Sequence, residues 1–251
     1  LMGYINDSGR LVIPYRFKTA GFVNQFNRTA RASDGKNTYL ILVPDSVLEV
    51  KDCDKLEVVN NRYFKAFKNG LWYLTDQFGI KISENGYTQI FPVKGVDTLF
   101  YVVENGLTGL CNQHNAYIFD PIYPNISQLT GDLYKVQTKQ RSWIILCANC
   151  KTLSDTFSSI AVSNDNPELI KGVNKNSEDV YLHRNGELII RSEDVQINNF
   201  ANEFIEVKVR KGRRYISQLY DLQSRRFVDS LEGPFANSNV KNTIYFNDKK
   251  L

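Results

Sequence analysis

Short stretches of alternating or wholly apolar residues recur along this chain, separated by tight turns. Residues 65–75 read KAFKNGLWYLT, and residues 100–111 read FYVVENGLTGLC. The phrase returns about every 35 residues, and a fixed period of about 20–50 residues is the signature of a repeat architecture. We count seven copies, which begin near Gly3, Thr38, Leu71, Leu107, Arg141, Glu178 and Arg213.

Two kinds of turn divide each copy into strands. Gly70, Gly106 and Gly212 each lie between two strand-like runs, and Asn-Gly supplies the positive φ angles that a two-residue hairpin needs. We therefore predict that the last strand of one copy pairs antiparallel with the first strand of the next. A second turn, DSGR at 7–10 and RNGE at 184–187, joins the first strand to the second. A short further strand in the AGFVNQF region would make four strands per copy.

Apolar patterning predicts how these strands are covered. Residues 39–43 and 143–146 are apolar on both faces, so they must lie between neighbouring sheets. Small four-stranded sheets that each cover the next describe a β-propeller, which has typically about four to eight blades. The sequence thus predicts an all-β fold: a seven-bladed β-propeller with about 36 residues per blade. Residues 1–251 would form this single domain. An open β-solenoid is the alternative.

The ends of the chain predict that the ring closes. Residues 3–7 align with the first strand of a copy, and residues 242–247 align with the last. These two strands are hairpin partners elsewhere in the chain. We therefore expect 242–247 to pair with 3–7, which would protect edges that otherwise invite aggregation.

The first copy carries the most complete signature, GYIND, SGR, LVIP, YRF and AGFVNQF over residues 3–26. This string resembles the WG-repeat family, also called KWG, whose consensus is close to KWGYIDKSGKVVIPPQFDDAGPF. Residues 181–190, YLHRNGELII, are a good match as well, whereas the Trp-Gly pair is nowhere intact: Tyr73 follows Trp72, and Ile144 follows Trp143. The resemblance implies a bacterial, β-propeller-like repeat protein that acts as a scaffold for binding.

Charge is modest overall and uneven along the chain. Lys and Arg number 31 against 27 Asp and Glu, a formal net charge of +4, which does not by itself argue for nucleic acid. The segment 204–226 is strongly basic, with Arg225 and Arg226 following the predicted hairpin. The partner-binding residues that we predict there are Lys208, Arg210, Lys211, Arg213 and Arg214. A solvated hairpin face is the alternative interpretation.

Alternation along this strand predicts which side chains are outward. Apolar side chains occupy 205, 207 and 209, while Glu206, Lys208 and Arg210 alternate with them. Because successive side chains in a strand point to opposite faces, the strand should be half exposed.

Four cysteines leave three interpretations open. Cys147 and Cys150 have CxxC spacing, which zinc sites and redox motifs share. The sequence has one such pair and two histidines, His114 and His183, which is a poor ligand set for structural zinc. Inert thiols are the favoured interpretation, a redox or disulfide pair the second, and zinc the third.

Chemistry-bearing motifs do not stand out. The sequence has no GxSxG, HExxH, GxxxxGKS or GxGxxG string, and carboxylate pairs such as Asp52 with Asp54 are typical of solvated turns. We therefore predict a non-enzymatic scaffold without cofactor or metal that binds another protein or a peptide, in a compartment that the sequence does not assign. Two alternatives stay open: an anionic partner such as nucleic acid on the basic hairpin, and a glycan or small ligand. The tyrosines that would carry the glycan alternative are Tyr15, Tyr63, Tyr87 and Tyr123.

Overall fold

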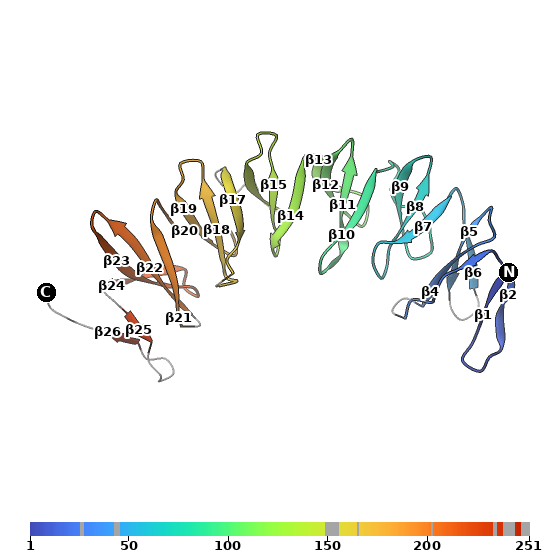
Figure 1. Cartoon of the computed structure of the whole chain (residues 1–251), viewed down its shortest axis with the longest axis horizontal. Helices are drawn as coiled ribbons and strands as arrows, with labels where there is room; N and C mark the ends of the chain where they lie inside the picture. The colour runs from blue at the N-terminus through green and yellow to red at the C-terminus, as the bar shows by residue number, and fades with distance from the viewer. Residues whose placement is uncertain are drawn as a thin grey trace. The chain divides into compact units, whose positions relative to one another are not determined.

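The chain is described from a computed structural model. The structure describes residues 1–25, 28–42, 46–148, 156–164, 166–201, 203–232, 235–237 and 244–246. Within these ranges the chain forms antiparallel strands and no α-helix, which confirms the all-β prediction (Figure 1).

The chain divides into two compact units, Leu1–Ile126 and Ser127–Leu251. The strands of the first unit are β1 (Met2–Ile5), β2 (Leu11–Phe17), β3 (Thr19–Ala20), β4 (Thr29–Ser33), β5 (Thr38–Leu42), β6 (Ser46–Val50), β7 (Lys55–Val58), β8 (Phe64–Lys68), β9 (Leu71–Thr75), β10 (Gln89–Val93), β11 (Val96–Glu104), β12 (Leu107–Asn112) and β13 (Tyr117–Tyr123). The strands that follow are β14 (Asn125–Thr130), β15 (Leu133–Gln137), β16 (Trp143–Cys147), β17 (Phe157–Val162), β18 (Leu169–Asn174), β19 (Asp179–His183), β20 (Leu188–Ser192), β21 (Val195–Ala201), β22 (Phe204–Lys211), β23 (Arg214–Asp221), β24 (Arg226–Glu232), β25 (Phe235–Asn237) and β26 (Ile244–Phe246).

The predicted hairpins are confirmed. β8 pairs with β9, β11 with β12 and β22 with β23, each antiparallel. Gly70, Gly106 and Gly212, which form the turns between them, have φ angles of 83°, 78° and 65°. These angles favour glycine because a Cβ is poorly accommodated there. The preceding Asn69 and Asn105 also have positive φ, as a two-residue hairpin of the Asn-Gly type requires.

The repeat period marks the same strand in every copy. Each of the seven predicted starts falls at or within two residues of the start of β1, β5, β9, β12, β16, β19 or β23. Sheets of four strands in sequence order follow, namely β3-β4-β5-β6, β10-β11-β12-β13 and β21-β22-β23-β24.

One region departs from separate four-stranded sheets. β14 to β20 form one seven-stranded sheet, in which β16 and β17 are joined at the pair Trp143 and Phe157. Residues 149–155, between these strands, lie outside the described part of the chain.

Apolar clusters join successive sheets within each unit. In the first unit, Leu40 and Val50 of one sheet pack with Leu56, Phe64 and Ala66 of the next. In the second unit, a cluster joins β18–β20 to β21–β23 in the same way. The sheets therefore cover one another, as the apolar runs at 39–43 and 143–146 predicted, although residue 43 lies outside the described part of the chain. The buried area supplies most of the stabilisation.

At equivalent points of three copies, a basic side chain reaches a backbone carbonyl of a later strand that is not its neighbour in the sheet. Arg31 Nη1 donates to the Leu56 carbonyl (2.7 Å), Lys65 Nζ to the Ile90 carbonyl (3.5 Å) and Lys135 Nζ to the Ile160 carbonyl (3.2 Å). In each case the acceptor lies 25 residues after the donor. Lys65 and Lys135 also lie over the rings of Trp72 and Trp143. These side chains therefore have a structural role: Arg31 and Lys65 join two sheets, and Lys135 joins two strands of the seven-stranded sheet.

Ring closure and the single domain stay predictions. β1 pairs with β2, and β26 pairs with β25. The predicted pairing of 242–247 with 3–7 is not among the strand pairs of the described residues, and 242, 243 and 247 lie outside them.

Candidate functional site

The basic segment forms the predicted hairpin of β22 and β23. Lys211 pairs with Arg214 beside the turn, and Lys208 pairs with Ser217 deeper in the sheet. The five predicted binding residues therefore lie on one hairpin of the second unit, ordered from a sheet-embedded base to an exposed tip.

At the base, the basic side chains are engaged within the protein. Lys208 Nζ lies 3.2 Å from Glu206 Oε2. Arg210 Nη1 lies 3.5 Å from Asp194 Oδ2, and its Nε donates to the Gly212 carbonyl. Tyr215 donates its hydroxyl to the same Asp194 oxygen (2.8 Å), and this bond raises the pKa of the tyrosine. Lys208 and Arg210 thus belong to local ion pairs, although the Arg210 side chain stays 57% exposed.

The half-exposed strand was predicted in part wrongly. Ile205 and Val207 are buried as expected, but Glu206 on the opposite face is only 5% exposed. Asn198 Nδ2 donates to Glu206 Oε2 (2.9 Å), and Lys208 neutralises that carboxylate. Buried charges need such partners. Alternation gives the face on which a side chain lies, and whether that face is covered depends on the rest of the protein.

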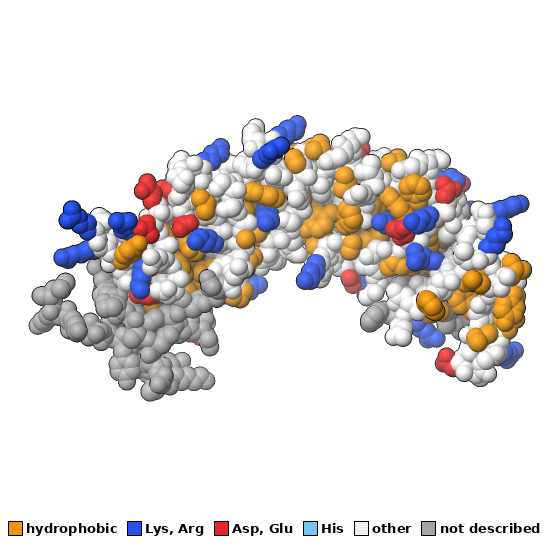
Figure 2. All heavy atoms as spheres, in the orientation of Figure 1, with side chains coloured by type: hydrophobic (Ala, Val, Ile, Leu, Met, Phe, Trp, Pro, Cys, Tyr) orange, Lys and Arg blue, Asp and Glu red, His pale blue; other side chains and the backbone are white. Residues whose placement is uncertain are grey.

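At the tip, the cations are exposed and without ion pairs among the described residues. Lys211, Arg213 and Arg214 are all exposed, and the turn glycine lies between them. Figure 2 shows Lys and Arg side chains gathered at this end of the hairpin. The tip, defined as these three residues, is the part of the predicted site that is available to a partner.

A hollow of about 630 Å³ adjoins the hairpin. Its lining includes Arg191 and Arg210 together with the carboxylates of Glu178, Glu193 and Asp194. The positively charged tip therefore lies next to a surface that carries both positive and negative side chains.

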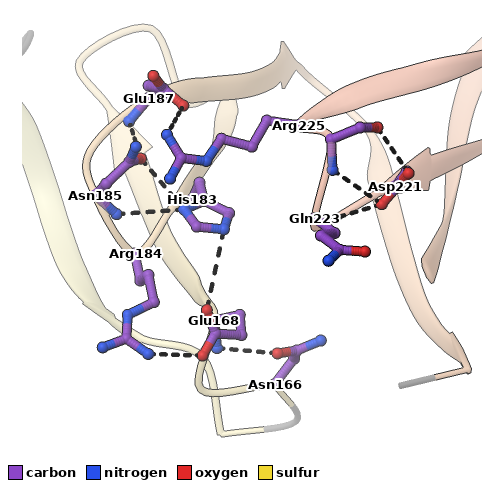
Figure 3. A network of polar contacts seen from close by, with 10 residues as sticks. Asn166, Glu168, His183, Arg184, Asn185, Glu187, Asp221, Gln223 and Arg225 are labelled. Atoms are coloured by element: carbon purple, nitrogen blue, oxygen red, sulfur yellow. Dashed lines mark hydrogen bonds and ion pairs between the residues drawn. The ribbon is translucent and has the colours of Figure 1, made fainter. Parts of the chain in front are cut away.

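Arg225, the neighbouring cation of the sequence prediction, belongs to a polar network (Figure 3). Its Nη1 lies 3.2 Å from Glu187 Oε2, and the Glu187 backbone N–H donates to Asn185 Oδ1. A separate hydrogen bond between the Asn185 and Glu187 side chains lowers the pKa of the Glu187 carboxyl, and the positive charge of Arg225 lowers it further. His183 is buried in this network, with Nδ1 3.2 Å from Asn185 Oδ1.

The cysteines differ from the favoured interpretation at one position. Cys53 and Cys111 are buried free thiols, and burial raises the pKa of Cys111 to about 12. Cys147 is disulfide-bonded, so its interpretation as an inert thiol is wrong. Cys150 lies outside the described residues. The described residues contain no group of three or more His, Cys, Asp or Glu side chains placed to hold a metal.

Two of the candidate glycan-binding tyrosines are packed inside the first unit. Tyr87 is fully buried and donates to Asn115 Oδ1 (2.7 Å). Tyr63 packs edge-on against Phe100 and donates to Gln113. Tyr123 is half-buried, and Tyr15, at 61% exposed, is the one of the four with a largely open ring. The expectation that all four lie outside the core is wrong for Tyr87.

Sequence reasoning missed a second surface in the first unit. Phe78 and Ile80, on the turn after β9, are 46% and 63% exposed beside a hollow of about 580 Å³. The signal was present: DQFGIK at 76–81 has apolar residues where the first and sixth copies have the polar turns DSGR and RNGE.

No protein-family model matches the chain, and no curated protein matches it. Among solved structures it is similar to the C-terminal WD40 domain of Sif2, with 9% identity over 84% of this chain and 71% of that chain and a TM-score of 0.35. It is similar to apo AztD from Citrobacter koseri, with 11% identity over 84% of this chain and 71% of that chain and a TM-score of 0.35. It is also similar to Hsv2 from Kluyveromyces lactis, with 9% identity, 89% and 85% coverage and a TM-score of 0.33.

Among the described residues there is also no helix with the length and apolar character needed to cross a membrane.

Proposed function

We propose that the chain is a non-enzymatic repeat scaffold, of the WG-repeat kind, that binds an acidic protein or peptide through the tip of the β22–β23 hairpin. The observation that carries this proposal is the contrast along one hairpin. Lys208 and Arg210 are held in internal ion pairs, while Lys211, Arg213 and Arg214 are exposed and form no ion pair with a described residue.

The tip is chemically suited to carboxylates. Two arginines and a lysine can form charge-assisted hydrogen bonds, and arginine can do so through two parallel N–H groups. Complementary charge also speeds encounter with an acidic partner. The sheet does not need these cations, because its register is set by backbone pairing and by the buried Ile205 and Val207.

Mixed charge beside the tip favours a protein or peptide over nucleic acid. Glu178, Glu193 and Asp194 line the adjoining hollow. A continuous phosphate backbone that extended from the tip into this hollow would meet like charge, which disfavours binding. A polypeptide can present both signs of charge along its length.

Affinity capture with paired baits tests the proposal. The wild-type chain and a variant with Lys211→Ser, Arg213→Ser and Arg214→Ser are used to capture partners from the native cell, followed by mass spectrometry. We expect a partner that the variant loses, with affinity at least about tenfold lower for the variant and falling as salt rises. Equal capture by both baits would show that the tip is a solvated surface and not a binding site.

We further propose that the sheets belong to a closed seven-bladed β-propeller formed by the whole chain as one domain. β1 and β2 correspond to the third and fourth strands of a four-stranded sheet, since the Asn6 turn between them has the same side-chain bonds as the Asn112 turn between β12 and β13. β25 and β26 follow β24 where the first and second strands of the next sheet would come. In the four-stranded sheets the second strand pairs with the third. Apolar side chains on β1 and β2, including Met2 and Ile5, are exposed (Figure 2). A strand paired with β1 would cover part of this apolar surface.

Hydrogen exchange measured by mass spectrometry tests ring closure. The amides of Met2–Ile5 should be slower to exchange in the full chain than in a chain that lacks 242–251, because pairing protects the edge of β1. The same exchange rate in both chains would exclude the pairing.

A further inference from the structure

Turns of one type follow β1 and β12, and they are held by the same bonds. Asn6 Oδ1 accepts the N–H groups of Ser8 and Arg10, and Asn112 Oδ1 accepts those of His114 and Ala116. Side chains at these two following positions project from a fixed backbone. Their identity is therefore not dictated by the turn itself.

The turn after β9 has the same geometry but different side chains. Asp76 Oδ1 accepts the N–H groups of Phe78 (2.9 Å) and Ile80 (2.8 Å). Phe78 and Ile80 thus occupy the positions that Ser8 and Arg10 occupy in the first copy. Asn185 and Glu187 occupy them in the sixth copy, whose turn has the same backbone bonds. Two large apolar side chains are kept exposed on a rigid turn that polar residues form equally well.

These side chains border a hollow of about 580 Å³, within the range of ligand-binding pockets, about 300–1,000 Å³. Val50 of β6 and Ala66 of β8 supply apolar lining from the two facing sheets of the first unit. Three lysines and the carboxylates of Glu49 and Asp52 also line it, one of these lysines, Lys68, being paired with Asp54.

One polar group in the lining lacks a hydrogen bond. Thr75 is 1% exposed, and its Oγ1 is a buried oxygen with no hydrogen-bond partner in the described part of the structure. An unpaired buried hydroxyl costs about 1–3 kcal/mol, so an occupant that shifts the side chains covering this oxygen and bonds to it recovers a favourable interaction. A purely hydrocarbon occupant would leave it unpaired.

We infer that this hollow, which we name the Phe78 pocket, binds an extended peptide through one of its apolar side chains. The inference rests on the proposed binding function and adds a second contact site for a polypeptide. Phe78, Ile80, Val50 and Ala66 would surround the apolar side chain, as anchors in interface pockets are surrounded. The peptide backbone supplies the N–H and C=O groups that Thr75 can pair with. The balanced charge of the rim suits a polypeptide and not a polyanion.

Binding of short capped peptides to the full chain tests the inference. The probes are a fluorescent peptide with a central leucine between uncharged residues and the same peptide with serine in place of leucine, measured by fluorescence polarisation. The variant is Phe78→Asn with Ile80→Glu, which installs the residues of the sixth copy at these positions. The control is Ile122→Ser, which removes an exposed apolar side chain elsewhere in the same unit.

We expect the leucine peptide to bind, the serine peptide to bind at least about tenfold more weakly, and the affinity to change little with salt. The Phe78→Asn, Ile80→Glu variant should lose at least about tenfold, while Ile122→Ser keeps wild-type affinity and all three proteins melt alike. Absence of binding by the leucine peptide, or equal binding by the variant, would overturn the Phe78 pocket. If the tip variant lost peptide binding while the Phe78→Asn, Ile80→Glu variant kept it, the Phe78 pocket would be excluded as the peptide site. The proposed binding function of the tip would still hold.

Discussion

Basic side chains have two different roles in this protein, and the comparison of Lys135 with the hairpin tip shows what separates them. Lys135 lies on the middle strand of its copy, donates to the Ile160 carbonyl of a following strand and lies over the Trp143 ring. Lys211, Arg213 and Arg214 lie around a turn, are exposed, and have no such contacts within the described residues. The same charge therefore serves the fold in one place and is available to a partner in the other.

The difference teaches that a basic residue in a repeat is informative only with its strand position. Cations on the middle strands recur at Arg31, Lys65 and Lys135 and reach the same type of carbonyl. Their long apolar stems cover neighbouring side chains while the charged ends find partners. Cations that fall outside this pattern are the ones to test for recognition.

The largest expected effect is the loss of a cation that joins two non-adjacent strands. Lys135→Ala should lower the free energy of unfolding by about 1–3 kcal/mol, because the Ile160 carbonyl loses its charged donor and the Trp143 ring loses its cover. Urea unfolding measures this change. Lys139→Ala, on the exposed turn of the same hairpin, is the matched control and should stay within about 0.5 kcal/mol of wild type. If both variants lose the same stability, the two roles are not distinct.

A smaller effect is expected from the contact between Lys135 and the Trp143 indole ring, and it measures how much this contact contributes to the free energy of unfolding. The distance from Nζ to the Trp143 centroid is 5.0 Å. A double-mutant cycle of Lys135→Gln and Trp143→Leu should give a coupling of about 0.5–1 kcal/mol, the usual size of a cation–π contact at a partly exposed site. Additive stability changes would assign the effect of Lys135 wholly to the carbonyl bond.

Local patterns predicted the strands well because hairpin signals lie within a few residues. The Asn-Gly turns at Gly70 and Gly106 and the starts of the copies follow directly from short-range backbone preferences. Contacts between non-adjacent strands were not predicted, because Lys135 and its acceptor are 25 residues apart and nothing in the strand alternation specifies the acceptor.

The same limit applies to the candidate site. Sequence placed all five cations on one hairpin, but the division into an engaged base and a free tip depends on Asp194 and Glu206, which only the folded sheet brings to Arg210 and Lys208. The burial of Tyr87 likewise depends on neighbours that short patterns do not specify.

The smallest expected effect concerns Asp34, a half-exposed carboxylate that is held by hydrogen bonds within the protein. It extends the comparison of held and available charges to an anionic side chain. Asp34 Oδ1 accepts the backbone N–H groups of Asn37 and Lys36 (2.8 Å each), and Oδ2 accepts the Tyr39 hydroxyl (2.7 Å). These bonds, with that of Asn37 the strongest, lower the pKa of Asp34 to about 2.

Because the folded pKa is below the unfolded value of about 3.9, ionised Asp34 stabilises the fold above that pH. This contribution is lost as the pH falls through about 2. We expect Asp34→Asn to be less stable than wild type at neutral pH, and the gap to narrow steadily as the pH is lowered from about 5 toward 2. Thermal melts of both proteins across this range measure the gap. A gap that stays constant would show that the Asp34 carboxylate, like the cations of the tip, is not held by its surroundings.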